Sequence, residues 1–325
     1  MILKLIHNNN IGTYAFMLFL VVLCWLKPMV LGYTVDAGSF DSAMPLWSFF
    51  SFVASIPWLA YLLSIVSCVV ISLSINRLNS KYGLLSKQSA LPGIVFVFLV
   101  GGLIRAQGFN PVWLIALFFV LAFEYLFEAH NYRRVAKECF LAAFWISTAS
   151  LVSYKVVLIF PLIFIIMGIL RLLNVKSFLA AIIGLLLPWL FLLGYELGFG
   201  SISNFFSYIN FSWLKIFESN DHPLFMLGYL ATIAFIFLIA LFSVLGAYGV
   251  KKIYTRKLYQ VFIFCGLYFV GMLGISGLNI EWVILVALPF SVLVAHLLDQ
   301  IRSLVWQNVV ITAMILIPIV GQILL

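Results

Sequence analysis

The sequence predicts an all-α fold, a polytopic helical membrane bundle of about eleven transmembrane helices with the N-terminus in the cytoplasm and the C-terminus outside. Three observations predict this class. Hydrophobic residues make up 65% of the chain and charged residues only 9%, with a mean hydropathy of +1.21, whereas a soluble domain carries about 25% charged residues. Several apolar runs approach the length of a membrane span. Most basic residues lie in the short segments between those runs, on one predicted side of the membrane.

Eleven apolar stretches are candidates for membrane spans, because crossing about 30 Å of hydrocarbon takes about 20 apolar residues in a helix. They run over 11–32, 56–75, 91–104, 111–127, 139–153, 156–170, 177–194, 223–247, 260–278, 280–297 and 304–325. The third, fifth and sixth stretches are short for a bilayer. The number of spans therefore needs support from a second signal.

The basic residues supply that signal. With the N-terminus in the cytoplasm, fourteen of the 18 lysines and arginines fall on the cytoplasmic side, as the positive-inside rule requires. These fourteen are Lys4, Arg77, Lys81, Lys87, Arg133, Arg134, Lys137, Arg171, Lys176, Lys251, Lys252, Arg256, Lys257 and Arg302. Treating 139–170 as one span would move several of them outside and remove the bias. Eleven spans therefore fit the charges better than ten.

The chain is expected to form a single integral membrane domain over 1–325, with two longer outer loops at 33–55 and 195–222. Both loops are rich in aromatic and small polar residues. The spacing of apolar residues around Pro45 predicts a short amphipathic helix that lies along the membrane interface. Exposed aromatic surface is costly in water, so we expect the aromatic segment 203–217 to fold against the bundle.

Several classes of function lack support in the sequence. The four cysteines lie inside apolar stretches without CxxC spacing, so we expect buried, unpaired thiols and no metal site. No run of basic residues interleaved with aromatics predicts nucleic-acid binding. No Walker, GxSxG, HExxH or dinucleotide-binding motif occurs, so cytoplasmic ATP-driven chemistry is not supported.

Candidate site residues are few, and they lie on the predicted outer side. Asp36 and Asp41 follow the first span and could supply a general base or a metal ligand at the membrane surface. The alternative is a pair of solvated loop acids. Arg105, Lys155 and Lys215 each lie near an expected helix end and could hold a lipid phosphate. The alternative for these three is that they reach to the interface without a specific ligand.

Three segments carry a resemblance: NRLNSKYGLLSKQSALPGIVFVFL, the pair Asn110-Pro111, and LPWLFLLGYELGFGSISNFFSYINFSWL. They resemble an uncharacterised family of bacterial inner-membrane proteins, a likeness that covers most of the chain and implies no particular activity. The layout is also remotely similar to the C-type glycosyltransferase superfamily, whose enzymes use lipid-phosphate sugars. That resemblance implies catalysis on the outer face by an acid of the first outer loop, which here holds Asp36 and Asp41. The chain departs from the superfamily in that this loop is short and lacks a DxD or DE pair.

Three hypotheses for the function follow. The first is a glycosyltransferase of the bacterial inner membrane that uses a polyprenyl-phosphate sugar donor on the outer face. Asp36 or Asp41 would act as base, Arg105, Lys155 or Lys215 would bind the donor phosphate, and a divalent metal ion is the cofactor such a site could hold. The second is a non-enzymatic subunit or scaffold of an envelope assembly or secretion complex, in contact with other envelope proteins. The third is a transporter or flippase, which the scarcity of mid-span ionisable residues disfavours. Membrane lipids are expected partners in each case, and nucleic acid in none.

Overall fold

The computed structural model describes residues 11–31, 44–85, 89–131, 135–208, 224–249, 251–275 and 279–301, together with 309–310, 312, 318–319 and 322. Every regular element in these ranges is a helix. Seven of the helices are long and apolar enough to cross a membrane. The predicted class, a multi-pass helical membrane protein, is therefore confirmed. The number of eleven spans and the sidedness of the termini stay predictions.

The helices follow one another along the chain with short connections. They are α2 (Ile11–Leu31), α3 (Pro45–Ala54), α4 (Pro57–Tyr82), α5 (Leu91–Gly101), α6 (Ile104–Gln107), α7 (Pro111–Asn131), α8 (Val135–Ser150), η2 (Tyr154–Ile159), α9 (Phe160–Ile169), α10 (Val175–Phe199), α11 (Ile202–Tyr208), α12 (Leu224–Gly246), α13 (Ile253–Ile275), η4 (Ile280–Trp282) and α14 (Val283–Gln300). The seven long apolar ones are α2, α4, α7, α10, α12, α13 and the continuous pair η4–α14.

The contacts divide the chain into two compact units. Unit 1 comprises Met1–Val35, Pro57–Phe109 and Ser219–Leu325, and unit 2 comprises Asp36–Ile56 and Asn110–Glu218. Unit 1 therefore contains α2, α4–α6 and α12–α14, and unit 2 contains α3 and α7–α11. The single membrane domain expected from the sequence stays a prediction, and each unit is described separately.

The centre of unit 1 is the short helix α5, whose 11 residues are all buried. The ends of a helix leave backbone groups without partners, and burying them is costly. Side chains from other helices solve this problem. At the start of α5, the N–H of Gly93 donates to Oδ1 of Asn76 on α4 (2.8 Å). Near its end, the hydroxyl of Tyr229 on α12 donates to the carbonyl of Leu99 (2.9 Å).

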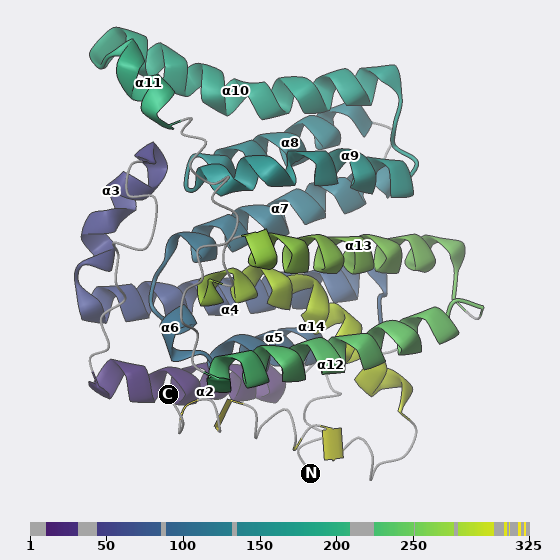
Figure 1. Cartoon of the computed structure of the whole chain (residues 1–325). Coiled ribbons are helices and arrows are strands. Elements are labelled where there is room, and N and C mark those ends of the chain that lie inside the picture. Colours follow the sequence, from purple (N-terminus) through teal and green to yellow (C-terminus); the bar gives the residue numbers. More distant parts are fainter. Residues whose placement is uncertain are drawn as a thin grey trace. The chain divides into compact units, whose positions relative to one another are not determined.

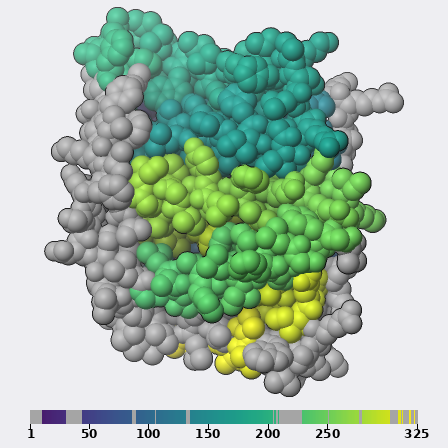
Figure 2. Space-filling model, turned by 45° about the vertical axis from the view of Figure 1, so that its right-hand side comes forward, coloured from purple at the N-terminus to yellow at the C-terminus, as the bar shows by residue number. Residues whose placement is uncertain are grey.

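Helices α2, α4, α6 and α14 contact α5. Helix α14 packs along it and is itself almost wholly buried. Figure 1 shows α12, α13 and α14 running back and forth beside one another. Helix α12, green in Figure 2, instead presents many large apolar side chains at the surface. An exposed apolar face on a long helix suits contact with lipid.

Unit 2 is built on the close packing of α10 against α8. Gly184 allows that approach, because a Cβ at this position would lie 2.5 Å from the carbonyl oxygen of Phe140. Pro188 interrupts the hydrogen bonding inside α10. One turn earlier, Ser147 of α8 donates to the carbonyl of Leu185 (2.5 Å). Small residues and hydroxyl-to-carbonyl bonds are typical of helix pairs in membranes.

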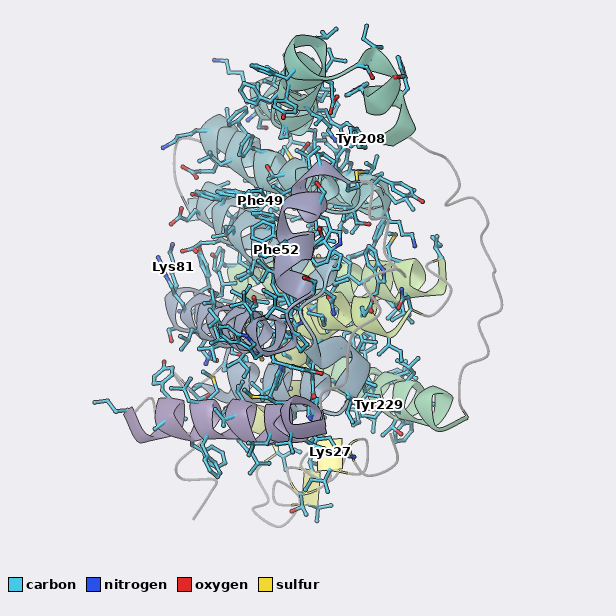
Figure 3. The ribbon with its side chains drawn as sticks, turned by 90° about the vertical axis from the view of Figure 1, so that its left-hand side faces the viewer. Lys27, Phe49, Phe52, Lys81, Tyr208 and Tyr229 are labelled. Atoms are coloured by element: carbon cyan, nitrogen blue, oxygen red, sulfur yellow. The ribbon has the colours of Figure 1, made fainter. Side chains whose placement is uncertain are left out.

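A helix does begin at Pro45, as the sequence predicts. Helix α3 buries Trp47, which is 1% exposed, and leaves Phe49 and Phe52 78% and 72% exposed (Figure 3). The N–H of Leu46 donates to the carbonyl of Leu151 (3.2 Å), which fixes α3 to the end of α8 within unit 2. The exposed side of α3 carries Phe49 and Phe52, so burial does not divide the helix into an apolar and a polar face. Its location at the membrane interface stays a prediction.

Two helices extend further than hydropathy alone predicts. Helix α4 continues to Tyr82 and α13 begins at Ile253, so Arg77 and Arg256, which were expected in loops, lie on helices. Hydropathy marks where the chain stops being apolar, whereas a helix can continue through the headgroup region into water. The block 139–170 forms two helices separated at 151–153, as the charge distribution predicts.

Candidate functional site

Only two of the five candidate site residues lie in the part of the chain that the structure describes. Asp36, Asp41 and Lys215 fall outside it. Arg105 lies on α6 in unit 1, where the structure describes its backbone but not its side chain. Lys155 lies on η2 in unit 2 and is partly buried. Arg105 is thus the candidate that lies beside a group of described polar residues, around α6.

The break between α5 and α6 gathers amide groups. The carbonyl of Gly101, at the end of α5, accepts from Nε2 of Gln107 (2.5 Å) and from Nε2 of Gln322 (3.0 Å). The same nitrogen of Gln322 donates to the carbonyl of Cys24 on α2 (2.7 Å). These bonds satisfy backbone oxygens that the end of α5 would otherwise leave unpaired inside the protein.

A buried indole joins three helices at the same break. Nε1 of Trp25 on α2 donates to Oγ of Ser64 on α4 (2.8 Å) and to the backbone carbonyl of Gln107 (2.9 Å). Trp25, Ser64 and Gln107 are each 0% exposed. Because all three are buried and bonded, α6 is held in a defined position beside α2 and α4.

Gln107 also carries an acceptor that these bonds leave unused. Its side-chain oxygen Oε1 is buried and has no hydrogen-bond partner among the described residues. A buried acceptor without a donor costs about 1–3 kcal/mol. Such an atom is a suitable acceptor for a hydroxyl group of a ligand, or for a water molecule.

A carboxylate reaches the same region from far along the sequence. Glu281 lies on η4, which packs against α6, and is only 6% exposed. Buried carboxylates are expensive in membrane proteins and commonly mark functional sites. We define the α6 site as Arg105 and Gln107 of α6, Trp25, Ser64 and Glu281. The elements that carry the other three residues, α2, α4 and η4, each contact α6.

Unit 2 holds a second buried carboxylate, Glu196, near the end of α10. Glu196 is 5% exposed, and its Oε1 accepts from the hydroxyl of Tyr208 on α11 (3.2 Å). Burial and the neighbouring Glu196 carboxylate raise the pKa of the Tyr208 phenol above its usual value. Gly200 makes room for the carboxylate, because a Cβ there would overlap its Oε2. The ring of Phe205 on α11 also contacts Trp189 of α10, so the first residues of the 203–217 segment do fold against α10.

No cluster of three or more His, Cys, Asp or Glu side chains able to hold a metal occurs within the described residues. The four cysteines are buried and unpaired, as predicted. Comparisons of the chain with known protein families, with characterised proteins and with solved structures give no match. The chemistry must therefore be argued from the residues themselves.

The sequence analysis did not select Gln107, Ser64, Trp25 or Glu281 as site residues. A neutral amide carries no charge signal, and a carboxylate at the edge of an apolar stretch is expected to be solvated. The one usable signal was the polar sequence between two apolar stretches, from Arg105 to Asn110.

Proposed function

We propose that this protein is a membrane enzyme of the bacterial inner membrane that transfers a sugar from a polyprenyl-phosphate donor at the outer surface, with the α6 site near the reacting groups. The observation that carries the proposal is the meeting of α6 and η4, which brings the helix of Arg105 and the buried Glu281 to one place in unit 1. The resemblance to C-type glycosyltransferases suggests this reaction class, and the α6 site supplies residue types that it needs.

Each group has a defined task in the proposed reaction. An acceptor hydroxyl attacks the anomeric carbon of the sugar, the bond to the lipid phosphate breaks, and the phosphate leaves with the electron pair. A carboxylate from Asp36, Asp41 or Glu281 takes the hydroxyl proton. Arg105 stabilises the negative charge on the departing phosphate. The unused oxygen of Gln107 accepts a hydrogen bond from a sugar hydroxyl.

Binding of polyprenyl monophosphate to the purified full-length protein tests the phosphate assignment. We expect Arg105→Gln to weaken binding about tenfold or more, because a charge-assisted hydrogen bond is worth about 1.5–3 kcal/mol. Arg77→Gln is the matched control. Arg77 is exposed near the end of α4, whereas Ser64 of the α6 site lies in the first half of that helix. Equal affinity of Arg105→Gln and wild type for the lipid would contradict the assignment.

Genetic complementation tests whether a carboxylate acts as base. We expect Asp36→Asn with Asp41→Asn, or Glu281→Gln, to lose function while the protein still inserts and accumulates, because a general base contributes about 10²–10⁴-fold to the rate. Full complementation by both the double variant and Glu281→Gln would reject the enzyme. It would favour the scaffold hypothesis, in which aromatic substitutions in 203–217 disrupt assembly.

A further inference from the structure

Unit 1 contains a second polar site, away from the α6 site, at the turn between α12 and α13. The ammonium group of Lys251 is partly buried there. Its Nζ donates to the carbonyl of Leu84 (3.3 Å) and to the hydroxyl of Tyr259 (3.3 Å), and it lies 4.4 Å from the centre of the Tyr259 ring. Burial lowers the pKa of Lys251 to about 8, although the charge of Asp299 opposes this shift.

The position of Lys251 is fixed by the structure around it. The hydroxyl of Tyr259 itself donates to the carbonyl of Leu84 (2.6 Å), and Gly83, with φ of +58°, sets the turn that presents this carbonyl. The ring of His296 on α14 stands edge-on to the Tyr259 ring, 4.8 Å between centres. His296 is 1% exposed, and its Nδ1 has no hydrogen-bond partner in the described part of the chain. The turn is therefore a built polar site and not a solvated loop.

Three cations converge on this turn. Lys251 and Lys252 precede α13, and Arg256 lies in its first turns with Nε bonded to the carbonyl of Lys251 (2.7 Å) and Nη2 to that of Gly249 (3.3 Å). The first turn of α13 contains no acidic residue. Cations at the positive end of a helix repel its dipole and one another. Among the described residues, the hydrogen bonds of Lys251 and Arg256 go to carbonyls and a phenol, and Asp299 is an acid whose charge acts on Lys251. Three cations against this one carboxylate leave the cluster with a net positive charge.

Exposed apolar side chains lie on the two helix ends that this turn joins. Phe242 and Leu245, in the last turns of α12, are 69% and 45% exposed, and Ile253, the first residue of α13, is 73% exposed. The positive-inside rule explains why basic residues lie in this loop. It does not explain why Lys251 is drawn into the protein or why exposed apolar side chains lie beside it.

We propose that the α12–α13 corner, formed by Lys251, Lys252 and Arg256 above Phe242, Leu245 and Ile253, binds the phosphate headgroup of an anionic phospholipid in the leaflet that faces it. The phosphate adds negative charge beside three cations that Asp299 alone does not neutralise. The acyl chains cover the exposed apolar side chains. Basic pockets at the ends of transmembrane helices bind anionic headgroups in this way.

Native mass spectrometry of the full-length protein with phosphatidylglycerol or phosphatidylethanolamine tests the proposal. We expect the anionic lipid to bind preferentially. Each basic residue near a membrane surface contributes about a fivefold factor in affinity for anionic lipid, so replacing Lys251, Lys252 and Arg256 together by Gln should weaken phosphatidylglycerol binding roughly a hundredfold. The matched control replaces Lys137, Arg171 and Lys176 of unit 2, which removes the same charge from the same predicted side.

Three outcomes overturn the proposal. They are unchanged binding to the triple variant, an equal loss in the control, and displacement of the lipid by millimolar inorganic phosphate, which would indicate a soluble phosphate ligand. The single variant Lys252→Gln separates a loss of binding from a folding defect, because the Lys252 side chain is exposed and its replacement should leave the fold intact. We expect it to weaken binding about fivefold with unchanged thermal stability, and unchanged affinity would also reject the site.

Discussion

Helix α5 of unit 1 and helix α10 of unit 2 solve the same problem in different ways. Both must satisfy the backbone groups at their ends. Helix α10 does so locally: Oδ1 of Asn174 accepts from the N–H of Ser177 (2.7 Å), and Oγ of Ser177 accepts from the N–H of Asn174 (3.1 Å). Helix α5 instead depends on Asn76 and Tyr229, which come from other helices.

The difference shows where a buried site can be built. A helix with local caps can lie at the edge of the bundle, and α10 does expose one long apolar face. A helix capped by its neighbours can be short and buried. The backbone groups at its end, and the side chains that bond to them, then lie inside the protein. The α6 site lies at such an end. Four experiments test this contrast.

The largest expected effect is in unit 2, where Gly184 allows α10 to pack closely against α8. Gly184→Leu places a side chain against the backbone of α8, and we expect a loss of about 3 kcal/mol in the free energy of unfolding. Unfolding in mixed detergent and SDS micelles measures it. The control is Gly194→Leu in the same helix, where a Cβ meets nothing within 4 Å. A cost for Gly194→Leu as large as that for Gly184→Leu would contradict the packing argument.

Removing a long-range cap should cost more than removing a local one. Asn76→Leu leaves the N–H of Gly93 buried without an acceptor, for which we expect about 2 kcal/mol. Asn174→Ala removes a cap from a helix end that solvent can reach, for which we expect about 1 kcal/mol. The same unfolding assay compares Asn76→Leu with Asn174→Ala. The control is Asn76→Asp, which retains an acceptor for the N–H of Gly93. The reverse order of the two losses would show that α5 does not need Asn76.

The hydrogen bond at the other end of α5 should contribute less. Tyr229→Phe removes the donor to the carbonyl of Leu99 and keeps the ring, and hydrogen bonds between membrane helices average about 0.6 kcal/mol. We expect a loss of that size, measured against Tyr195→Phe, whose side chain is 61% exposed. Gly102 lies against the same ring, so a loss of several kcal/mol would instead indicate that Tyr229→Phe disturbs the packing there.

The last prediction concerns the titration of Lys251, which is measured as a midpoint and not as a loss of stability. Its pKa is lowered to about 8 from the ordinary 10.5, so between those values the unfolded chain binds a proton that the folded protein does not. The cost of holding charged Lys251 in the folded protein is therefore fully present below about pH 8 and is lost as the pH rises to 10.5. The pH profile of Lys251 acylation, read by peptide mass spectrometry, should have a midpoint near 8 in lipid-free protein. A midpoint near 10.5 would show that Lys251 is solvated.

Much of the fold could be predicted from the sequence. The apolar stretch at 111–127 and that at 280–297 each correspond to a helix, and the separation of 139–170 into two helices followed from charge placement. The helix at Pro45 also followed from spacing, although its amphipathic character did not. The candidate site could be predicted less well. Arg105 lies on α6, but its neighbours Gln107 and Glu281 gave no signal that distinguished them from ordinary polar residues at helix ends.

The sequence by itself determined the class, the approximate helices and the local caps. Its apolar composition requires backbone hydrogen bonds to be made within each segment, and only helices do this with a single stretch of chain. Tertiary structure alone decided which polar groups are buried. The bond from Tyr229 to Leu99 spans 130 residues and that from Lys251 to Leu84 spans 167. Such bonds depend on which helices pack together, and residue type and spacing along the chain carry no information about that packing.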